Sequence, residues 1–124
     1  MLYHMTNILN QPNATIIEFG TEHSELSEIS LRLVSPQIIG AIKLADPPRF
    51  VYDLSSATII SSHFIRLLIK TWKLAISRGG DIVLVGVKDD CLDELERLKI
   101  DSLWKRFESR DEAVASFSGK RKRM

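Results

Sequence analysis

The feature that most constrains the fold is the run Ile82–Val87, which is apolar at every position except Gly86. A strand with one face in water alternates apolar and polar residues, whereas an unbroken apolar run is typical of a strand covered on both faces. Just before this run, Gly79-Gly80 is a typical helix end, and apolar residues at helical spacing predict that helix over Phe64–Arg78. A helix that leads into a buried strand predicts an α/β domain with a mainly parallel sheet.

Similar patterns place the other strands. β-forming residues bounded by turn residues predict strands over Ala14–Phe19 and Phe50–Leu54. An edge strand over residues 2–9 and a short last strand over Trp104–Phe107 complete the expected sheet.

Two shorter helices are predicted near the C-terminus. Asp89 or Asp90 is expected to cap a helix that ends at Leu98. The segment Ser109–Glu112 is a capping box, in which a serine and a glutamate satisfy free backbone N–H groups, and it predicts a last helix to about Phe117.

The stretch Ser24–Ala45 permits two interpretations. Four apolar residues recur at helical spacing: Leu31, Val34, Ile38 and Ile42. Residues Ile29–Val34 also alternate like a strand. Because Pro36 lacks an N–H and its ring clashes with the preceding turn, we expect a helix that is broken near Ser35-Pro36, with Pro36 opening its second part. Asp46-Pro47-Pro48 is expected to end that helix.

The length of 124 residues suits one domain, which we place at residues 1–117, followed by a disordered basic tail at residues 118–124. Four of the 17 Lys and Arg side chains lie at Lys120–Arg123, so the rest of the chain carries 13 of them against 16 Asp and Glu. A domain with that acidic excess is a poor general binder of nucleic acid.

The single cysteine, Cys91, excludes an internal disulfide and the usual cysteine-based zinc sites, and it fits a reducing compartment. No apolar run approaches the ~20 residues that span a membrane. Polar residues interrupt the N-terminal stretch, so no signal peptide is apparent. We therefore expect a cytoplasmic protein without membrane contact.

The sequence gives little support for an enzyme. It has neither a Gly-rich phosphate-binding loop nor a Gly-x-Ser-x-Gly nucleophile elbow. Ser62, His63 and Asp53 could be written as a catalytic triad, but neighbouring residues on a helix point about 100° apart, so His63 cannot easily reach the Ser62 hydroxyl. We expect a binding module with no catalytic residue, no metal and no cofactor.

The most informative segment joins the predicted strand that ends near Asp53 to the helix that follows. Ser61 suits the N-cap, because its side-chain oxygen can accept a backbone N–H about three residues on. Ser62 is then the first helical residue, exposed at the positive end of the helix dipole. A phosphate there meets free N–H groups, and Arg66, four residues on, lies on the same face and could pair with it.

One face of this helix is basic along its length: His63, Arg66, Lys70 and Lys73. Such a face is either merely solvated or a docking surface for an acidic partner. Asp53, at the end of the strand, either accepts N–H bonds from the loop or takes part in handling phosphate.

Five sequence blocks, in the same order and at the same spacing, resemble the STAS domain of bacterial anti-sigma factor antagonists over roughly Pro47–Phe117. The blocks are Val51–Ser55, Ser61-Ser62, Arg78–Gly86, Leu98–Trp104 and Ser109–Ala113. The resemblance implies an α/β, STAS-like (SpoIIAA-like) fold, in which about four helices flank a small mixed β-sheet.

The resemblance also implies a phosphorylatable serine at the start of the second helix, which here is Ser62. The family's motif places an Asp before that serine and a Gly two residues after it, and these positions are Ser61 and Phe64 in this chain. Ser61 can still cap the helix but carries no negative charge. Phe64 is expected to add bulk where a partner approaches.

Two functions stay open at this point. In the first, the dephosphorylated chain binds an anti-sigma factor of the serine kinase type, and phosphorylation of Ser62 weakens that binding. The candidate partner-binding residues are Asp53, Ser61, His63, Arg66 and Lys70. In the second, the chain is a STAS scaffold or oligomerisation adaptor in which Ser62 is never modified, and its partner can be a second copy of itself.

Overall fold

The computed structural model describes residues 6–19, 28–57 and 60–119. The described strands are β1 (Thr6–Asn10), β2 (Thr15–Phe19), β3 (Arg49–Asp53), β4 (Asp81–Val85) and β5 (Arg106–Phe107). The described helices are α1 (Glu28–Leu44), α2 (Ser62–Ser77), α3 (Asp89–Arg97) and α4 (Arg110–Gly119), with a 3₁₀ turn, η2, at Asp101–Leu103.

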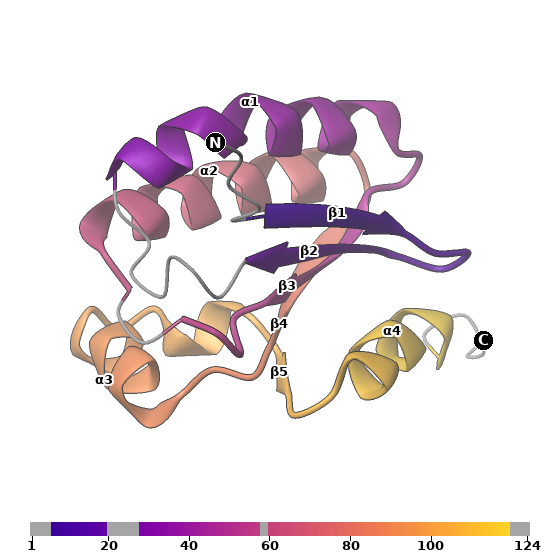
Figure 1. Cartoon of the computed structure of the whole chain (residues 1–124). Coiled ribbons are helices and arrows are strands. Elements are labelled where there is room, and N and C mark those ends of the chain that lie inside the picture. The colour runs from indigo at the N-terminus through magenta and orange to yellow at the C-terminus, as the bar shows by residue number, and fades with distance from the viewer. Residues whose placement is uncertain (1–5, 20–27, 58–59, 120–124) are drawn as a thin grey trace.

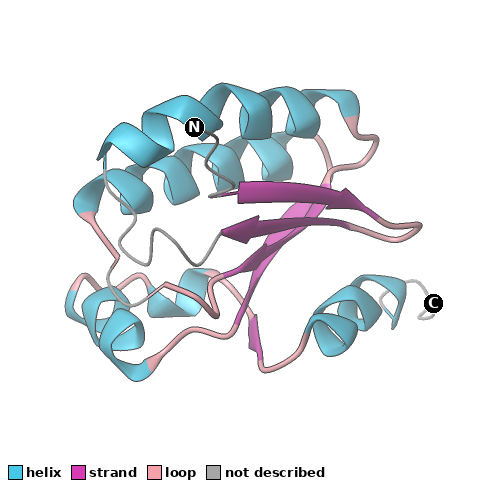
Figure 2. Ribbon diagram, in the orientation of Figure 1, coloured by secondary structure: helices cyan, strands magenta, loops and turns pink. Residues whose placement is uncertain are grey.

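The five strands form one mixed sheet in the order β1-β2-β3-β4-β5. β1 pairs antiparallel with β2, and each later pair is parallel (Figures 1 and 2). Each parallel connection after β2 carries a helix, because parallel neighbours need a crossover from one end of the sheet to the other. The α/β fold with a mainly parallel, mixed sheet is therefore confirmed.

Helices cover both faces of the sheet, as the unbroken apolar run at Ile82–Val87 predicted. Along β3, the side chains of Phe50 and Tyr52 belong to the core under α1 and α2, whereas Val51 belongs to a second core under α4. β4 alternates in the same way, and its residues 82–85 are all buried. Figure 1 shows α1 and α2 on one side of the strands and α4 on the other.

Helix α1 corrects one prediction: it runs through Pro36 without a break. The predicted break came from the missing N–H of Pro36, which costs about 3 kcal/mol in a helix interior. Pro36 is exposed, so its ring faces water, while the four apolar residues of the helical pattern are buried in one core: Leu31, Val34, Ile38 and Ile42. Burying each of them is worth about 1.5–3 kcal/mol, so packing on both sides of the proline outweighs the local penalty.

The boundaries of α2 follow the predicted signals closely. At its C-terminus the N–H of Gly79 donates to Ile76 O at 3.0 Å and that of Gly80 to Ala75 O at 2.8 Å. This pair of bonds is a Schellman motif, which needs the positive φ of +81° found at Gly79.

The capping of the last two helices was predicted with mixed success. Ser109 Oγ accepts the N–H of Glu112 at 3.2 Å, as the capping box requires. For α3 the prediction is wrong: Lys88 is the N-cap residue and makes no side-chain cap bond, while Asp89 and Asp90 are the first helical residues. Their charges still favour the helix there, because they face the positive end of its dipole.

Two further predictions concern the ends of the chain. The edge strand is present as β1, and α4 continues to Gly119, whereas residues 1–5 and 120–124 lie outside the described residues. Trp104 and Cys91 are both buried. The indole ring of Trp104 meets that of Trp72 edge to face, with ring centroids 5.8 Å apart.

Candidate functional site

The two serines between β3 and α2 lie as the sequence predicts. Ser61 is the N-cap of α2, with an extended backbone (φ −84°, ψ 165°), and its Oγ accepts the N–H of Phe64 at 3.1 Å. Ser62 is the first helical residue and is exposed. Because Ser61 supplies the cap, the Ser62 hydroxyl is not required for starting the helix.

Electrostatics at this helix start favour an added anion. Within the described helix α2, the first turn contains no acidic residue. The positive end of the helix dipole therefore lies under Ser62 without a carboxylate of the same turn to offset it. Arg66, one turn further along, is exposed.

Phe64 corrects the expectation that it adds bulk to the partner's side. Its side chain is fully buried and packs edge to face on Phe19 of β2, with ring centroids 5.5 Å apart at 89°. It points inward because position 64 belongs to the apolar stripe that α2 turns toward the sheet. The surface around Ser62 is therefore not enlarged by this aromatic ring.

Three of the predicted basic residues share one hollow on the α1–α2 surface. His63, Arg66 and Lys70 line a hollow of about 300 Å³ together with residues of α1. Arg32 is among those α1 residues, and Leu31 and Leu67 supply apolar surface. The sequence predicted the α2 residues of this hollow as candidate binding residues. It did not predict Arg32, because no sequence motif connects this position of α1 with α2.

Asp53, at the end of β3, is buried, and both oxygens of its carboxylate accept hydrogen bonds. Its Oδ1 accepts the N–H of Ser55 at 2.9 Å and the Ser55 hydroxyl at 2.6 Å, and its Oδ2 accepts Nε of Arg110 at 2.6 Å. Burial alone would raise the pKa of Asp53, but the bonds from Ser55 and Arg110 outweigh it and hold that pKa below the ordinary value. The expected role in accepting loop N–H bonds is confirmed.

No sequence pattern indicated Arg110 as the partner on the other side of Asp53. Arg110, the first residue of α4, also pairs with Glu18 of β2. One guanidinium thus joins two parallel strands to the helix on the far face of the sheet. Residues that lie 57 and 92 positions apart leave no local pattern that could reveal such a cluster.

Two residues between β3 and Ser61, Ser55 and Ala57, contact residues at the start of α3. Lys88 Nζ donates to the backbone oxygen of Ser55, and the Cys91 thiol lies 3.7 Å from Ala57 O. Burial raises the pKa of the Cys91 thiol, which keeps it protonated and unreactive. Two described residues of the loop, Ser55 and Ala57, therefore contact the start of α3.

Two arrangements, a triad of Ser62, His63 and Asp53 and a metal site, are not found among the residues that the structure describes. The Asp53 carboxylate is bonded to Ser55 and Arg110, so a triad with His63 and Ser62 does not form. No group of three His, Cys, Asp or Glu side chains in residues 6–19, 28–57 and 60–119 could hold a metal ion. No helix in the described part of the chain is long and apolar enough to cross a membrane.

A family model for the STAS domain matches residues 8–113, and the chain belongs to the STAS domain family. The match includes β2, β3, β4, the Ser61-Ser62 junction and the Asp53–Arg110 pair. No curated protein sequence matches the chain significantly.

Solved structures of anti-sigma factor antagonists share this fold. An anti-sigma-factor antagonist (STAS) domain protein from Planctomyces limnophilus has a TM-score of 0.86 at 24% identity, over 91% of this chain and 97% of its own. A putative anti-sigma factor antagonist from Thermotoga maritima has a TM-score of 0.79 at 18% identity, over 93% and 96%. SpoIIAA in its unphosphorylated form has a TM-score of 0.78 at 13% identity, over 92% and 96%.

Proposed function

We propose that this chain is a cytoplasmic, non-enzymatic binding module of the anti-sigma factor antagonist type, switched by phosphorylation of Ser62. In the dephosphorylated form it binds an anti-sigma factor of the serine kinase type. Phosphate on Ser62 weakens that complex. The observation that carries the proposal is an exposed serine hydroxyl at the start of a helix whose cap is made by its neighbour, Ser61.

This position can accept a phosphate without harm to the domain. A phosphoserine adds about −1.5 to −2 charges, and the helix start offers a favourable dipole and no acidic neighbour in the first turn. Arg66, exposed one turn on, is within reach of a phosphate on the same face. The phosphorylated protein therefore stays folded, and the change acts on whatever binds this surface.

The same phosphate is costly inside an interface. A partner that covers Ser62 must strip water from a double charge, which disfavours binding unless new partners replace that water. Shifting a complex from about 99% bound to about 99% free takes about 5.5 kcal/mol. Desolvation and repulsion of the phosphate can supply several kcal/mol of this difference. The basic residues that line the neighbouring hollow, His63, Arg66 and Lys70, supply a surface for acidic groups of the partner.

Two of the similar structures bear on the proposed switch. One is SpoIIAA in its unphosphorylated form. Another is a Moorella thermoacetica RsbS in which a serine is replaced by glutamate, with a TM-score of 0.78 at 17% identity. A glutamate in place of a serine carries part of the charge of a phosphoserine.

A direct test is incubation of the purified chain with ATP and serine kinases of the anti-sigma factor class, each first shown to phosphorylate its own substrate. We expect one phosphate, located on Ser62 by mass spectrometry of the peptides and absent from Ser62→Ala. The affinity of Ser62→Asp for the kinase that modifies the chain should be about tenfold lower than that of the original chain. The affinity of Ser62→Ala for this kinase should be unchanged. Ser102→Asp, an exposed serine in η2, controls for the added charge. Equal affinity of the Ser62 variants contradicts the switch.

A scaffold or oligomerisation adaptor without a phosphate cycle is the second candidate function. Ser61 favours it, because the family's motif has an acidic residue at this position. In this case no active kinase modifies Ser62, and both Ser62 variants bind partners or a second copy of the chain equally well.

A further inference from the structure

A second hollow, away from the α1–α2 surface, opens at the ends of β4 and β5. It measures about 520 Å³. Its lining comes from the residues after β4, from α3, from β5 and from the residue after β5: Gly86, Val87, Asp89, Leu92, Arg106, Phe107 and Glu108. In open α/β sheets, the crevice outside the carboxyl ends of parallel strands is the common place for ligands. None of the proposed roles of Ser62 uses this hollow.

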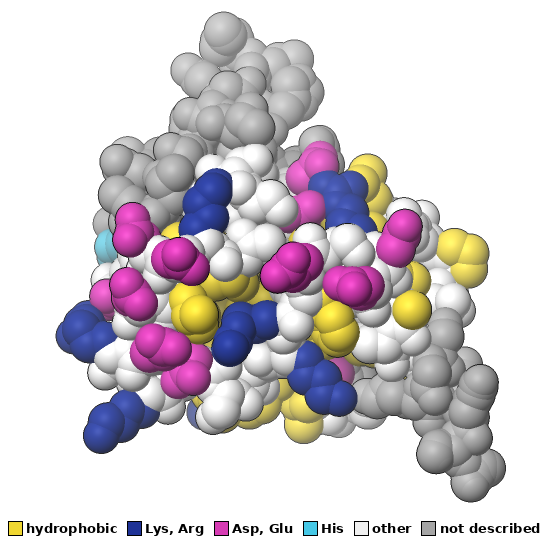
Figure 3. Space-filling model, turned by 90° about the horizontal axis from the view of Figure 1, so that it is seen from below, with side chains coloured by type: hydrophobic (Ala, Val, Ile, Leu, Met, Phe, Trp, Pro, Cys, Tyr) yellow, Lys and Arg dark blue, Asp and Glu magenta, His cyan; other side chains and the backbone are white. Residues whose placement is uncertain are grey.

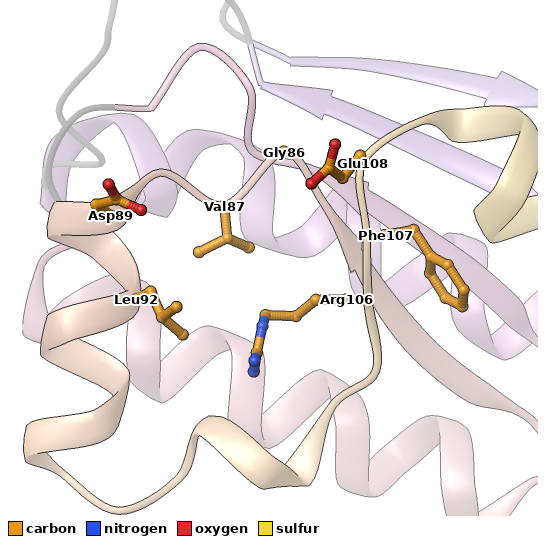
Figure 4. Close-up of a pocket in the computed structure, with 7 residues that line it drawn as sticks. All are labelled: Gly86, Val87, Asp89, Leu92, Arg106, Phe107 and Glu108. Carbon is orange, nitrogen blue, oxygen red and sulfur yellow. The ribbon is translucent and has the colours of Figure 1, made fainter.

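The base of the hollow is apolar and its upper rim is acidic. Figure 4 shows Val87 and Leu92 facing the space, with Glu108 and Asp89 above it and Arg106 along its lower side, whereas Phe107 turns away from it. Val87 and Leu92 are only partly buried, so they keep apolar surface that a partner can cover. The carboxylates of Asp89 and Glu108 are exposed.

The surroundings extend this acidic character. Helix α3 carries five acidic side chains: Asp89, Asp90, Asp93, Glu94 and Glu96. Its one basic side chain, Arg97, is paired with Glu94 at 2.6 Å. Figure 3 shows the face that contains α3 and α4, where Asp and Glu side chains lie around exposed apolar surface together with Lys and Arg side chains.

Three cations near the acidic rim are engaged by other groups. Arg106 donates to Asp101 O at 2.8 Å, which holds it on the lower side. Lys88 Nζ donates to the backbone oxygen of Ser55. The guanidinium of Arg110 is engaged by Asp53 and Glu18. The exposed carboxylates at the rim are therefore only partly offset.

The hollow is also held in shape by the loop before Ser61. Gly86 has a φ of +71°, and a Cβ at this position would lie 2.2 Å from Ser55 Oγ. Ser55 is in turn bonded to Asp53. The backbone that lines the hollow at Gly86 therefore packs closely on a serine that is itself hydrogen-bonded to Asp53.

We propose that this α3–β5 hollow is a docking site for a protein segment that carries an apolar side chain flanked by Lys or Arg. The apolar side chain covers Val87 and Leu92, and the cations lie over Asp89 and Glu108. Charge complementarity selects this occupant, because an acidic segment would face the carboxylates along the rim, which the nearby cations offset only in part. The proposal goes beyond the function proposed above, since it requires neither Ser62 nor a phosphate.

The test uses a short, fluorescently labelled amphipathic peptide made of Leu and Lys, with a Leu and Glu peptide of the same pattern as its counterpart. Fluorescence anisotropy with the whole chain should show binding of the Leu/Lys peptide only. NMR titration should shift the amide signals of residues 86–92 and 106–108. Absence of binding, or shifts confined to another surface, overturns the proposal.

Two matched substitutions separate a specific site from general attraction. Asp89 and Asp90 are neighbours, both exposed and both in the first turn of α3, but only Asp89 lines the hollow. We expect Asp89→Lys to weaken binding of the Leu/Lys peptide about tenfold and Asp90→Lys to change it less than about threefold. Equal losses would mean that the peptide senses only net charge, which overturns the proposal.

A second pair of substitutions tests the apolar part of the docking site. Leu92→Gln removes apolar surface inside the hollow and should weaken peptide binding, whereas Leu98→Gln, at an exposed leucine that does not line it, should not. Sedimentation of the unliganded chain tests another occupant. If the chain forms a dimer that Asp89→Lys dissociates, the face belongs to a second copy and the proposal is wrong.

Discussion

The Nε atom of Arg110 lies 2.6 Å from Oδ2 of Asp53, so the first residue of α4 is bonded to the last residue of β3. The same carboxylate also accepts the N–H and hydroxyl of Ser55, which begins the loop toward α2. This one nearly buried group therefore connects the helix on one face of the sheet to the segment that carries Ser61 and Ser62.

Removing Arg110 should destabilise the whole domain. Arg110→Ala leaves the Asp53 carboxylate nearly buried without its cation, which we expect to lower the free energy of unfolding by about 1–3 kcal/mol. Urea denaturation followed by circular dichroism measures the change. Arg97→Ala is the control, because the exposed Arg97–Glu94 pair should contribute less than about 1 kcal/mol. Equal losses from the two substitutions would show that the Asp53 pair adds nothing beyond a surface contact.

Asp53 should also make stability depend on acidic pH. Its pKa in the folded protein lies below the ordinary value of 3.8, so the unfolded chain binds the proton more tightly. The stabilisation is present above pH 3.8 and is lost as the pH falls toward and through the folded pKa. Denaturation midpoints from about pH 6 to pH 2 should therefore fall more steeply for the original chain than for Asp53→Asn. Parallel pH profiles would contradict this assignment.

The neighbouring serines should differ in what they contribute to stability. Ser61→Ala removes the acceptor of the Phe64 N–H and should cost about 1 kcal/mol. Ser61→Asp should keep the cap, and its charge should favour the helix start. Ser62→Ala should stay within about 0.5 kcal/mol of the original, because the cap does not use its hydroxyl. A larger loss in Ser62→Ala than in Ser61→Ala, measured by thermal or urea unfolding, would reverse the assigned roles.

Phe64 should behave as a core residue. Phe64→Ala removes a fully buried ring from its contact with Phe19 and should cost about 3–5 kcal/mol. Ile76→Ala, on the same helix but 48% exposed, should cost far less. Chemical denaturation compares the two. If Phe64→Ala left stability unchanged, the ring would have to lie on the surface.

Local patterns determined which elements form and the order in which they follow one another. Alternation, helical spacing and the serine, glycine and proline signals act within a few residues, so the start of α2, the Schellman motif after it and the doubly covered β4 could all be predicted. The serine cap before Phe64 belongs to this class, because its donor and acceptor lie three positions apart.

Only the tertiary structure decided which local preferences prevailed and which distant groups met. Packing carried α1 through Pro36, because burial of the apolar side chains on both sides of the proline outweighs its local penalty. The Asp53–Arg110–Glu18 cluster and the α3–β5 hollow join elements far apart in the chain. Such contacts form because the sheet brings the ends of its strands together. Local sequence patterns extend over only a few residues, so they do not predict these contacts.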